Sequence, residues 1–244
     1  MKHLKKVVGL LITVVLLDFQ IITGQAVDGG YRSTIERPDM ELLSRLRLNR
    51  TMTGIEKVNY SNIIGDPFLY KDFIPGSLTL KTGETLPLYL RYDIYTDEIQ
   101  FRQKEEIYVL VNTESVSVVM MDTLKFIYTR YMKSPGDISS IENSWFLLKE
   151  DGKCRLLIKK NLRLQSAEDA KPYQAAKPAK FIKTNDSFYL QPEGQNAMRV
   201  TSRKDILSIL SDKSSELNKF IDSARLGAKD INDLRKIVAF YNSR

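Results

Sequence analysis

From about residue 76 to residue 199, the chain is a series of short runs in which hydrophobic and polar residues alternate. This alternation has the period of a β-strand with one buried face. The run 86–95 shows it most clearly. Its apolar face would carry Leu86, Leu88, Leu90, Tyr92 and Ile94. Its second face would carry Pro87, Tyr89, Arg91, Asp93 and Tyr95.

Turn signals separate several of these runs. A short loop containing Gly83 lies between 76–81 and 86–95, and Asp151-Gly152 divides a later pair of runs. Asp-Gly between alternating runs is typical of a hairpin. Residues 165–180 are rich in Ala, Lys and Pro and have no periodicity, which predicts a long surface loop.

After residue 199 the spacing of apolar residues becomes helical. Three helical segments are expected. Thr201 or Ser202 can cap the first, Ser214 or Ser215 lies near the start of the second, and the third begins near Asp230. A run of strands followed by a run of helices predicts an α+β protein. We expect a curved antiparallel β-sheet of meanders and hairpins, followed by a C-terminal bundle of about three short helices.

The patterns divide the chain into four parts. We expect a signal peptide over 1–26, an irregular N-terminal arm over 27–64, an antiparallel β domain over 65–199, and a helical segment over 200–244 that packs on the sheet. Within the arm, a short helix is expected at 38–47, where Pro and Asp stand at its start.

The first 26 residues have the features of a secretory signal. They combine a basic start, an apolar run over 7–17, and small residues at Gly24 and Ala26 where a signal peptidase can cut. The alternative is a membrane anchor, but the apolar run is shorter than the ~20 residues that a spanning helix needs. We therefore expect an exported protein with no transmembrane span after cleavage.

Histidine and cysteine usage limits the available chemistry. His3 is the only histidine and would leave with the signal, so a mature chain would lack Ser-His-Asp and Cys-His pairs and histidine-ligated zinc. Cys154 is the only cysteine, which excludes an internal disulfide. Because it alternates in phase with Leu156 and Ile158, a buried, inert thiol is favoured over a reactive one. No cofactor and no metal site are predicted.

The second face of the run 86–95 is the first candidate binding site, through Tyr89, Arg91, Asp93 and Tyr95. A catalytic pair of carboxylates, Asp93 with Asp97, would require the two to face each other across a cleft. The same side chains also suit a binding surface for a partner. The remaining and most ordinary interpretation is a structural polar face of the sheet.

The second candidate is basic. Residues 153–183 contain nine Lys or Arg against two acids, a local charge of +7. Removal of 1–26 would lower the net charge of the chain from +7 to +5. The local charge of residues 153–183 is therefore larger than the net charge of the whole mature chain. Such a patch would attract polyanions, although a solvated face is the alternative interpretation. The candidate residues are Lys153, Arg155, Lys159, Lys160 and Arg163.

Two stretches carry a resemblance to a known group. These are the run LRYDIYTDEI at 90–99 and the closing FYN at 240–242, and the resemblance covers residues 65–244. Over this range the chain resembles uncharacterised secreted proteins of the Bacteroidota type. The resemblance implies a Gram-negative envelope location, periplasmic or associated with the outer membrane. Such proteins carry no assigned catalytic residues.

The predicted function is that of a secreted, non-enzymatic envelope protein. Its partner would be another envelope protein or an anionic glycan or lipid, and not a nucleic acid, because an exported protein rarely meets one. A first alternative is a periplasmic carrier that holds a lipid or other apolar ligand in a concave sheet. A second is a hydrolase that uses Asp93, Asp97 or Glu98.

Overall fold

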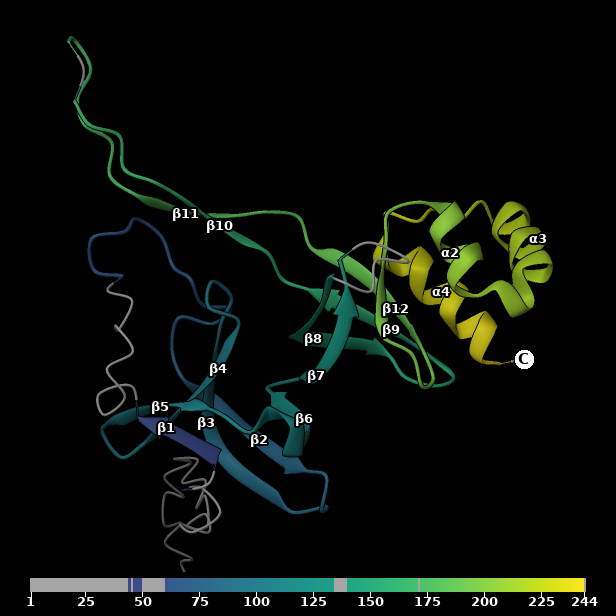
Figure 1. The fold of residues 1–244 in the computed structure, drawn as a ribbon, viewed down its shortest axis with the longest axis horizontal. Helices are drawn as coiled ribbons and strands as arrows, with labels where there is room; N and C mark the ends of the chain where they lie inside the picture. The colour runs from purple at the N-terminus through teal and green to yellow at the C-terminus, as the bar shows by residue number, and fades with distance from the viewer. Residues whose placement is uncertain (1–43, 45, 50–59, 134–139, 171, 244) are drawn as a thin grey trace, which may run out of the picture. The chain divides into compact units, whose positions relative to one another are not determined.

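The computed structural model describes residues 44, 46–49, 60–133, 140–170 and 172–243. The chain separates into two units, 1–34 and 35–244, and every described residue belongs to the second. The expected signal peptide and most of the expected arm and of its helix therefore lie outside the described residues. The described part consists mostly of β-strands, with three α-helices after residue 200 (Figure 1). This composition confirms the predicted α+β class.

Eleven of the described strands hydrogen-bond into one sheet, and six of them form its first section in the order β1-β5-β4-β3-β2-β6. Neighbouring strands in this section are antiparallel, and β2 and β3 form the hairpin predicted around Gly83. Strand β1 falls within the arm that was predicted to be irregular. The bounds are β1 Arg47–Asn49, β2 Ile74–Leu80, β3 Thr85–Asp93, β4 Glu98–Gln103, β5 Glu106–Leu110 and, after the 3-10 turn η1 Thr113–Ser115, β6 Val116–Met121.

The other five strands close on themselves as a small barrel, in the order β7-β13-β12-β9-β8 and back to β7. We call it the five-stranded ring. Strands β8 and β9 form the hairpin predicted at Asp151-Gly152. The bounds are β7 Leu124–Met132, β8 Ile141–Glu150, β9 Cys154–Lys159, β12 Ser187–Pro192 and β13 Ala197–Val200.

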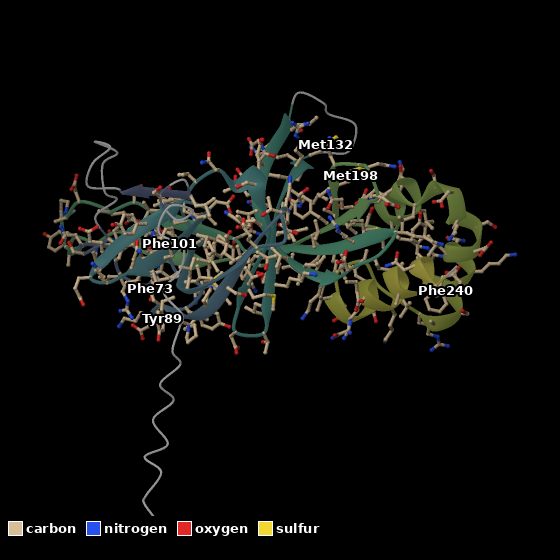
Figure 2. All side chains as sticks on the ribbon, turned by 90° about the horizontal axis from the view of Figure 1, so that it is seen from below. Phe73, Tyr89, Phe101, Met132, Met198 and Phe240 are labelled. Carbon is tan, nitrogen blue, oxygen red and sulfur yellow. The ribbon has the colours of Figure 1, made fainter. Side chains whose placement is uncertain are left out.

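Strand β7 makes the closure possible. The first part of one of its edges pairs with β6, and the last part of the same edge pairs with β13, while its other edge pairs with β8. The pairing with β13 is parallel, and it places Met132 beside Met198 (Figure 2). The expectation of a simple curved antiparallel sheet was therefore wrong in this half, because alternation within a strand does not reveal which distant strand it pairs with.

The two faces of the ring strands have different surroundings. Side chains that point inward form a core of their own: Ile127, Tyr131, Phe146, Leu157, Tyr189 and Ala197. On the outside, Trp145 and Leu147 pack with the apolar face of β3, whose Leu90 and Tyr92 are buried as predicted. The outward side chains of Cys154 and Leu156 pack instead against the helices.

The helices are α2 Arg203–Ile209, α3 Ser214–Ala224 and α4 Ile231–Asn242, with a 3-10 turn η3 Ser211–Lys213 before α3. Ser202 caps α2 in a reciprocal capping box with Asp205, as the sequence predicted. Asp230 caps α4, which begins where the sequence predicted. Their apolar side chains share a core with Cys154 and Leu156 of β9 and Leu190 of β12. No helix in the described ranges combines the length and apolar character needed to cross a membrane.

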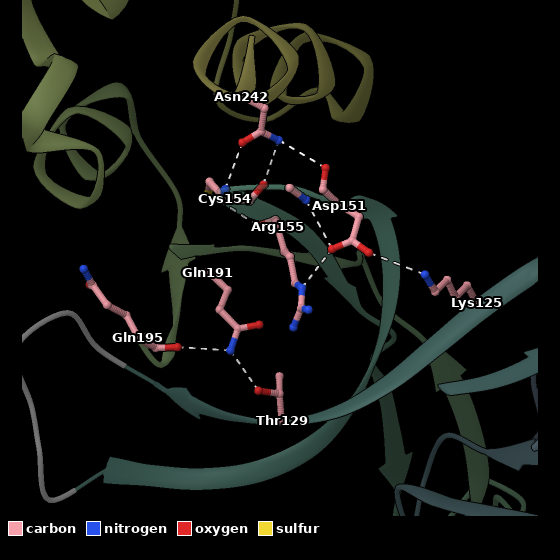
Figure 3. A network of polar contacts seen from close by, with 9 residues as sticks. Lys125, Thr129, Asp151, Cys154, Arg155, Gln191, Gln195 and Asn242 are labelled. Carbon is pink, nitrogen blue, oxygen red and sulfur yellow. Dashed lines mark hydrogen bonds and ion pairs between the residues drawn. The ribbon is translucent and has the colours of Figure 1, made fainter. Parts of the chain in front are cut away.

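The end of α4 is fastened to the β8–β9 turn by Asn242 (Figure 3). Its side-chain oxygen accepts a hydrogen bond from the Cys154 N–H at 2.8 Å, and its nitrogen donates to the carbonyls of Cys154 at 3.0 Å and Asp151 at 3.3 Å. Cys154 itself is fully buried, and this burial raises the pKa of its thiol to about 12. The thiol therefore stays protonated at neutral pH, in keeping with the predicted inert cysteine.

The described residues over 166–178 are exposed and lie outside the strands, which agrees with the predicted surface loop. They connect β10 Leu162–Gln165 to β11 Lys180–Lys183, which form a separate two-stranded hairpin (Figure 1). The prediction did not include this hairpin or the bridge between Glu168 and Lys177, because cross-strand backbone hydrogen bonds need no hydrophobic periodicity.

Gly152 provides a test of the Asn242 contact. A Cβ added at Gly152 would lie 2.7 Å from Nδ2 of Asn242, whereas one added at Gly83 would meet nothing within 4 Å. Both glycines have positive φ, so Gly83→Ala measures the backbone penalty alone, about 1–2 kcal/mol. We expect Gly152→Ala to cost about 1–3 kcal/mol more, because Asn242 must give up hydrogen bonds. Urea unfolding of the two variants measures this difference, and equal losses of stability would contradict it.

Candidate functional site

The five-stranded ring opens into a depression at the end where β7 and β9 finish and β8 begins. We call this depression, which has a volume of about 740 Å³, the ring mouth. Polar side chains and two tyrosines line it: Tyr131, Lys133, Lys159, Asn161, Thr184, Asn185, Asp186, Ser187, Tyr189 and Arg199.

Three aromatic rings form the floor of the ring mouth. Tyr131, Phe146 and Tyr189 meet edge to face, with ring centroids 5.0 to 5.6 Å apart. All three point into the ring because each occupies an inward position of its strand. Burial raises the pKa of both tyrosines, and a hydrogen bond from the Tyr131 hydroxyl to Glu142 at 2.8 Å adds to the effect at Tyr131. Both phenols are therefore neutral hydrogen-bonding groups.

A buried polar cluster joins the floor to the β3–β4 turn. Asp97 in this turn accepts hydrogen bonds from Tyr92 and from the hydroxyl of Ser144 in β8, each at 2.6 Å. The ammonium of Lys159 lies 3.4 Å from the Asp97 carboxylate, contacts the Ser144 hydroxyl, and lies 5.2 Å from the centre of the Tyr131 ring. This cluster fixes the β3–β4 turn against the ring.

Serine beside lysine is a pairing that supports nucleophilic catalysis when the amine is free to take the hydroxyl proton. Here Ser144 is fully buried, and Lys159 forms an ion pair with Asp97. A substrate at the ring mouth would not reach the hydroxyl. The arrangement is therefore suited to holding the fold together, and it adds the charge of Lys159 to the wall of the mouth.

Two hydrogen-bond donors of the ring mouth have no protein acceptor among the described residues. Arg199 is exposed and forms no ion pair within the described ranges, and the Tyr189 hydroxyl likewise has no hydrogen-bond partner there. The two residues face each other in the β12–β13 register. The acids at the rim are already engaged, since Glu142 pairs with Lys133 at 2.7 Å and Asp186 with Lys160 at 2.7 Å. The ring mouth can therefore bind a ligand that carries hydrogen-bond acceptors.

Asp93, a predicted binding residue, is fully buried. Its carboxylate accepts hydrogen bonds from the Tyr60 hydroxyl at 2.7 Å and from the backbone N–H groups of Tyr95 and Thr96 at 3.0 and 3.2 Å. Such bonds are typical of an aspartate that shapes a turn. Asp93 therefore organises the β3–β4 connection and is not available to a ligand.

The other three residues of this predicted face also contact protein neighbours, and of these Tyr95 is exposed. Arg91 lies over the ring of Phe68 at 3.5 Å and donates to Gln100 at 2.7 Å. Tyr95 packs on Phe181, with centroids 5.3 Å apart. Tyr89, labelled in Figure 2, lies 5.5 Å below the guanidinium of Arg102. Much of this face is covered by the segment that precedes β2, which explains why it is less open than its sequence indicated.

The predicted hydrolase carboxylates do not share one environment. Asp93 bonds the turn backbone, Asp97 bonds Ser144 and Tyr92, and Glu98 accepts a hydrogen bond from the Thr96 hydroxyl at 2.9 Å. Each therefore has its own set of partners.

The predicted basic residues are divided by the length of β9. Lys153 and Arg155 stand at its start, and Lys159 and Lys160 stand at its end, a separation of roughly 20 Å. Arg155 pairs with Asp151 at 2.9 Å (Figure 3). Arg163 is exposed on β10, in the separate hairpin. Of the five, the structure brings only Lys159 and Lys160 to the ring mouth or its rim.

The residues of the ring mouth and of its supporting cluster that the sequence did not indicate are Tyr131, Ser144, Tyr189 and Arg199. They come from four strands, and only ring closure gathers them. One usable signal was the second face of β9, where Leu157 lies between Arg155 and Lys159. A buried apolar residue there implies that this face also covers a core.

In the part of the chain that the structure describes, no three His, Cys, Asp or Glu side chains come together as a metal site would need. Comparisons with protein-family models, curated proteins and solved structures find no match for this chain. The architecture is that of an α+β protein in which a five-stranded ring continues an antiparallel sheet and is covered on one side by helices.

The Asp97–Lys159 pair can be tested with a double-mutant cycle of Asp97→Asn and Lys159→Met. Each single variant leaves one charged or polar partner partly buried, so each should destabilise the fold by about 1–3 kcal/mol. The double variant should lose less than the sum of the two, as measured by urea unfolding. The exposed Glu168–Lys177 pair, changed to Gln and Met, is the matched control and should show almost no coupling. Additive losses at the first pair would contradict the structural role.

Proposed function

We propose that this chain is an exported, non-enzymatic envelope protein that binds an anionic glycan at the ring mouth. The observation that carries the proposal is that Arg199 and the Tyr189 hydroxyl, which are neighbours in the β12–β13 register, are two donors with no protein acceptor within the described residues. Carboxylate, sulfate or phosphate groups on a sugar would supply the missing acceptors, and a guanidinium binds such groups through two parallel hydrogen bonds.

The surroundings of the two donors favour the same ligand class. Lys133 and Lys159 also line the wall, where each is paired with an acid, and Asn161 and Ser187 add neutral polar groups that suit hydroxyls. Asn161 is held by its own bonds to Asn185 at 2.8 Å and to Ser187 at 2.9 Å, so the rim is pre-organised. The depression is within the size range of small-molecule sites and too small for a folded partner.

Two alternatives from the sequence have less support. A carrier for an apolar ligand calls for an enclosed apolar space, whereas the ring mouth is open and mostly polar. A carboxylate hydrolase calls for two acids that face each other across a cleft, and the three acids considered are bound to separate partners.

Isothermal titration with tetragalacturonate, an acidic tetrasaccharide, tests the proposal. Arg199→Glu should weaken binding by roughly tenfold or more, because it removes the donor and places a negative charge in its position. Affinity should also fall as salt is added. Arg163→Glu, which makes the same charge change on the exposed β10, is the matched control and should bind like the parent chain. Equal weakening by both variants, or equal binding of neutral cellotetraose, would contradict a site at the ring mouth.

A second candidate function, binding of an envelope protein partner, is supported by the β10–β11 hairpin. Tyr173 lies between its strands with a relative exposure of 107% and a positive φ of 65°. The other described residues over 166–178 are exposed as well. A fully exposed tyrosine is unusual in a free protein surface, and tyrosine is enriched where proteins contact each other.

Photocrosslinking tests this second function. With p-benzoylphenylalanine at position 173, intact cells that make the protein should yield one discrete adduct, because a bound partner would surround that side chain. The same group at exposed Ser223 on α3 is the control and should yield none. A smear of products from both positions, or no adduct from position 173, would contradict partner binding by the hairpin.

A further inference from the structure

The ring has a second depression at its opposite end, where β9 and β13 begin and β12 finishes. Its volume is about 420 Å³. We call it the β9–β12 depression, and its lining residues are Gly152, Lys153, Arg155, Gln191, Pro192, Glu193, Gly194 and Gln195.

Gln191 has an unsatisfied buried atom in this depression. The residue is only 9% exposed, and its side-chain nitrogen donates to the Thr129 hydroxyl at 2.8 Å and to the Gln195 carbonyl at 3.1 Å (Figure 3). Its side-chain oxygen is buried and has no hydrogen-bond partner among the described residues. A buried amide oxygen without a donor is rare in folded proteins, because its lost hydration is not replaced.

The orientation of the Gln191 amide follows from its neighbours. The atom that faces the carbonyl oxygen of Gln195 must be a donor, so it must be the nitrogen. The Thr129 hydroxyl can accept from the same nitrogen. The unsatisfied atom is therefore the oxygen, and what it lacks is a donor.

Arg155 provides the complementary groups. Its Nε donates to Asp151 at 2.9 Å, and Asp151 is held in turn by Lys125 at 3.5 Å. This pairing orients the guanidinium and leaves both terminal nitrogens without a protein acceptor in the described part of the chain. Figure 3 shows the guanidinium of Arg155 and the amide of Gln191 extending toward the same space between β9 and β7.

We infer that the β9–β12 depression binds a small hydroxy-carboxylate. A hydroxyl of the ligand would donate to the Gln191 oxygen, and its carboxylate would accept from the terminal nitrogens of Arg155. A simple anion lacks the donor that Gln191 needs. A cationic ligand is disfavoured because Lys153 and Arg155 outnumber Glu193 in the lining. This site is separate from the ring mouth and does not depend on glycan binding there.

Sodium gluconate, which carries one carboxylate and several hydroxyls, is the probe. In ¹H–¹⁵N NMR spectra, gluconate should shift the backbone signals of Gly152 and Gly194 and the side-chain signals of Gln191, with saturation in the millimolar range. The signal of Gly65, which lies against Phe181 and does not line the depression, is an internal control. Acetate, which lacks the hydroxyls, and glucose, which lacks the carboxylate, should each shift these signals far less.

Variants at both ends of the ring complete the test. Gln191→Leu should abolish the gluconate shifts, and Arg155→Lys, which keeps a positive charge beside Asp151, should weaken binding severalfold. Arg199→Glu at the ring mouth should leave gluconate binding unchanged. If Gln191→Leu fails to fold, Arg155→Lys and the ligand series still decide the question. The inference is overturned if gluconate causes no shifts, which would leave a bound water as the partner of Gln191, or if acetate acts as well as gluconate.

Discussion

The structure depends on the way β7 divides its hydrogen-bonding edge. A strand has two edges. One edge of β7 pairs with β6 along its first part and with β13 along its last part, and the other edge pairs with β8. The first partner continues the antiparallel sheet and the second closes the ring. Because a ring of five strands is narrow, inward side chains fill its middle, and only those near the two ends reach solvent. Both depressions described above are consequences of this closure.

The ring also explains how polar groups can sit inside a β structure at modest cost. Ser144 and Asp97 are satisfied by each other, by Tyr92 and by Lys159, so the cluster is a connected network and not a set of isolated buried charges. Gln191 is the contrast, because one of its two polar atoms is satisfied and the other is not. A partly satisfied group at the end of a ring is where ligand binding has the most to contribute.

Local features of the fold could be predicted from the sequence, whereas long-range ones could not. Four local predictions were correct, because each depends on neighbouring residues: the alternation in β3, the Asp-Gly turn before β9, the cap at Ser202 and the start of α4 near Asp230. Ring closure depends on pairing Tyr131 with Ala197, for which no local pattern exists. The candidate site shows the same difference between local and long-range features. Lys159 was identified from its own segment, whereas Tyr189 and Arg199 become part of a site only when ring closure brings their strands together with β7. Asp93 was predicted to be available for binding because the segment before β2 that covers it has no regular hydrophobic pattern.

The hold of Asn242 on the β8–β9 turn bears on how the chain is assembled. A ribosome produces β8 and β9 long before α4, so the Cys154 backbone groups that Asn242 pairs with must wait, solvated, until that helix has been made. The same delay applies to the free edge at the end of β7, which has no partner before β13 is synthesised. An unpaired strand edge is a site for wrong association. The order of synthesis therefore sets a period in which the unpaired edge of β7 is open to wrong association. This period ends when β13 and the helices that follow it have been made.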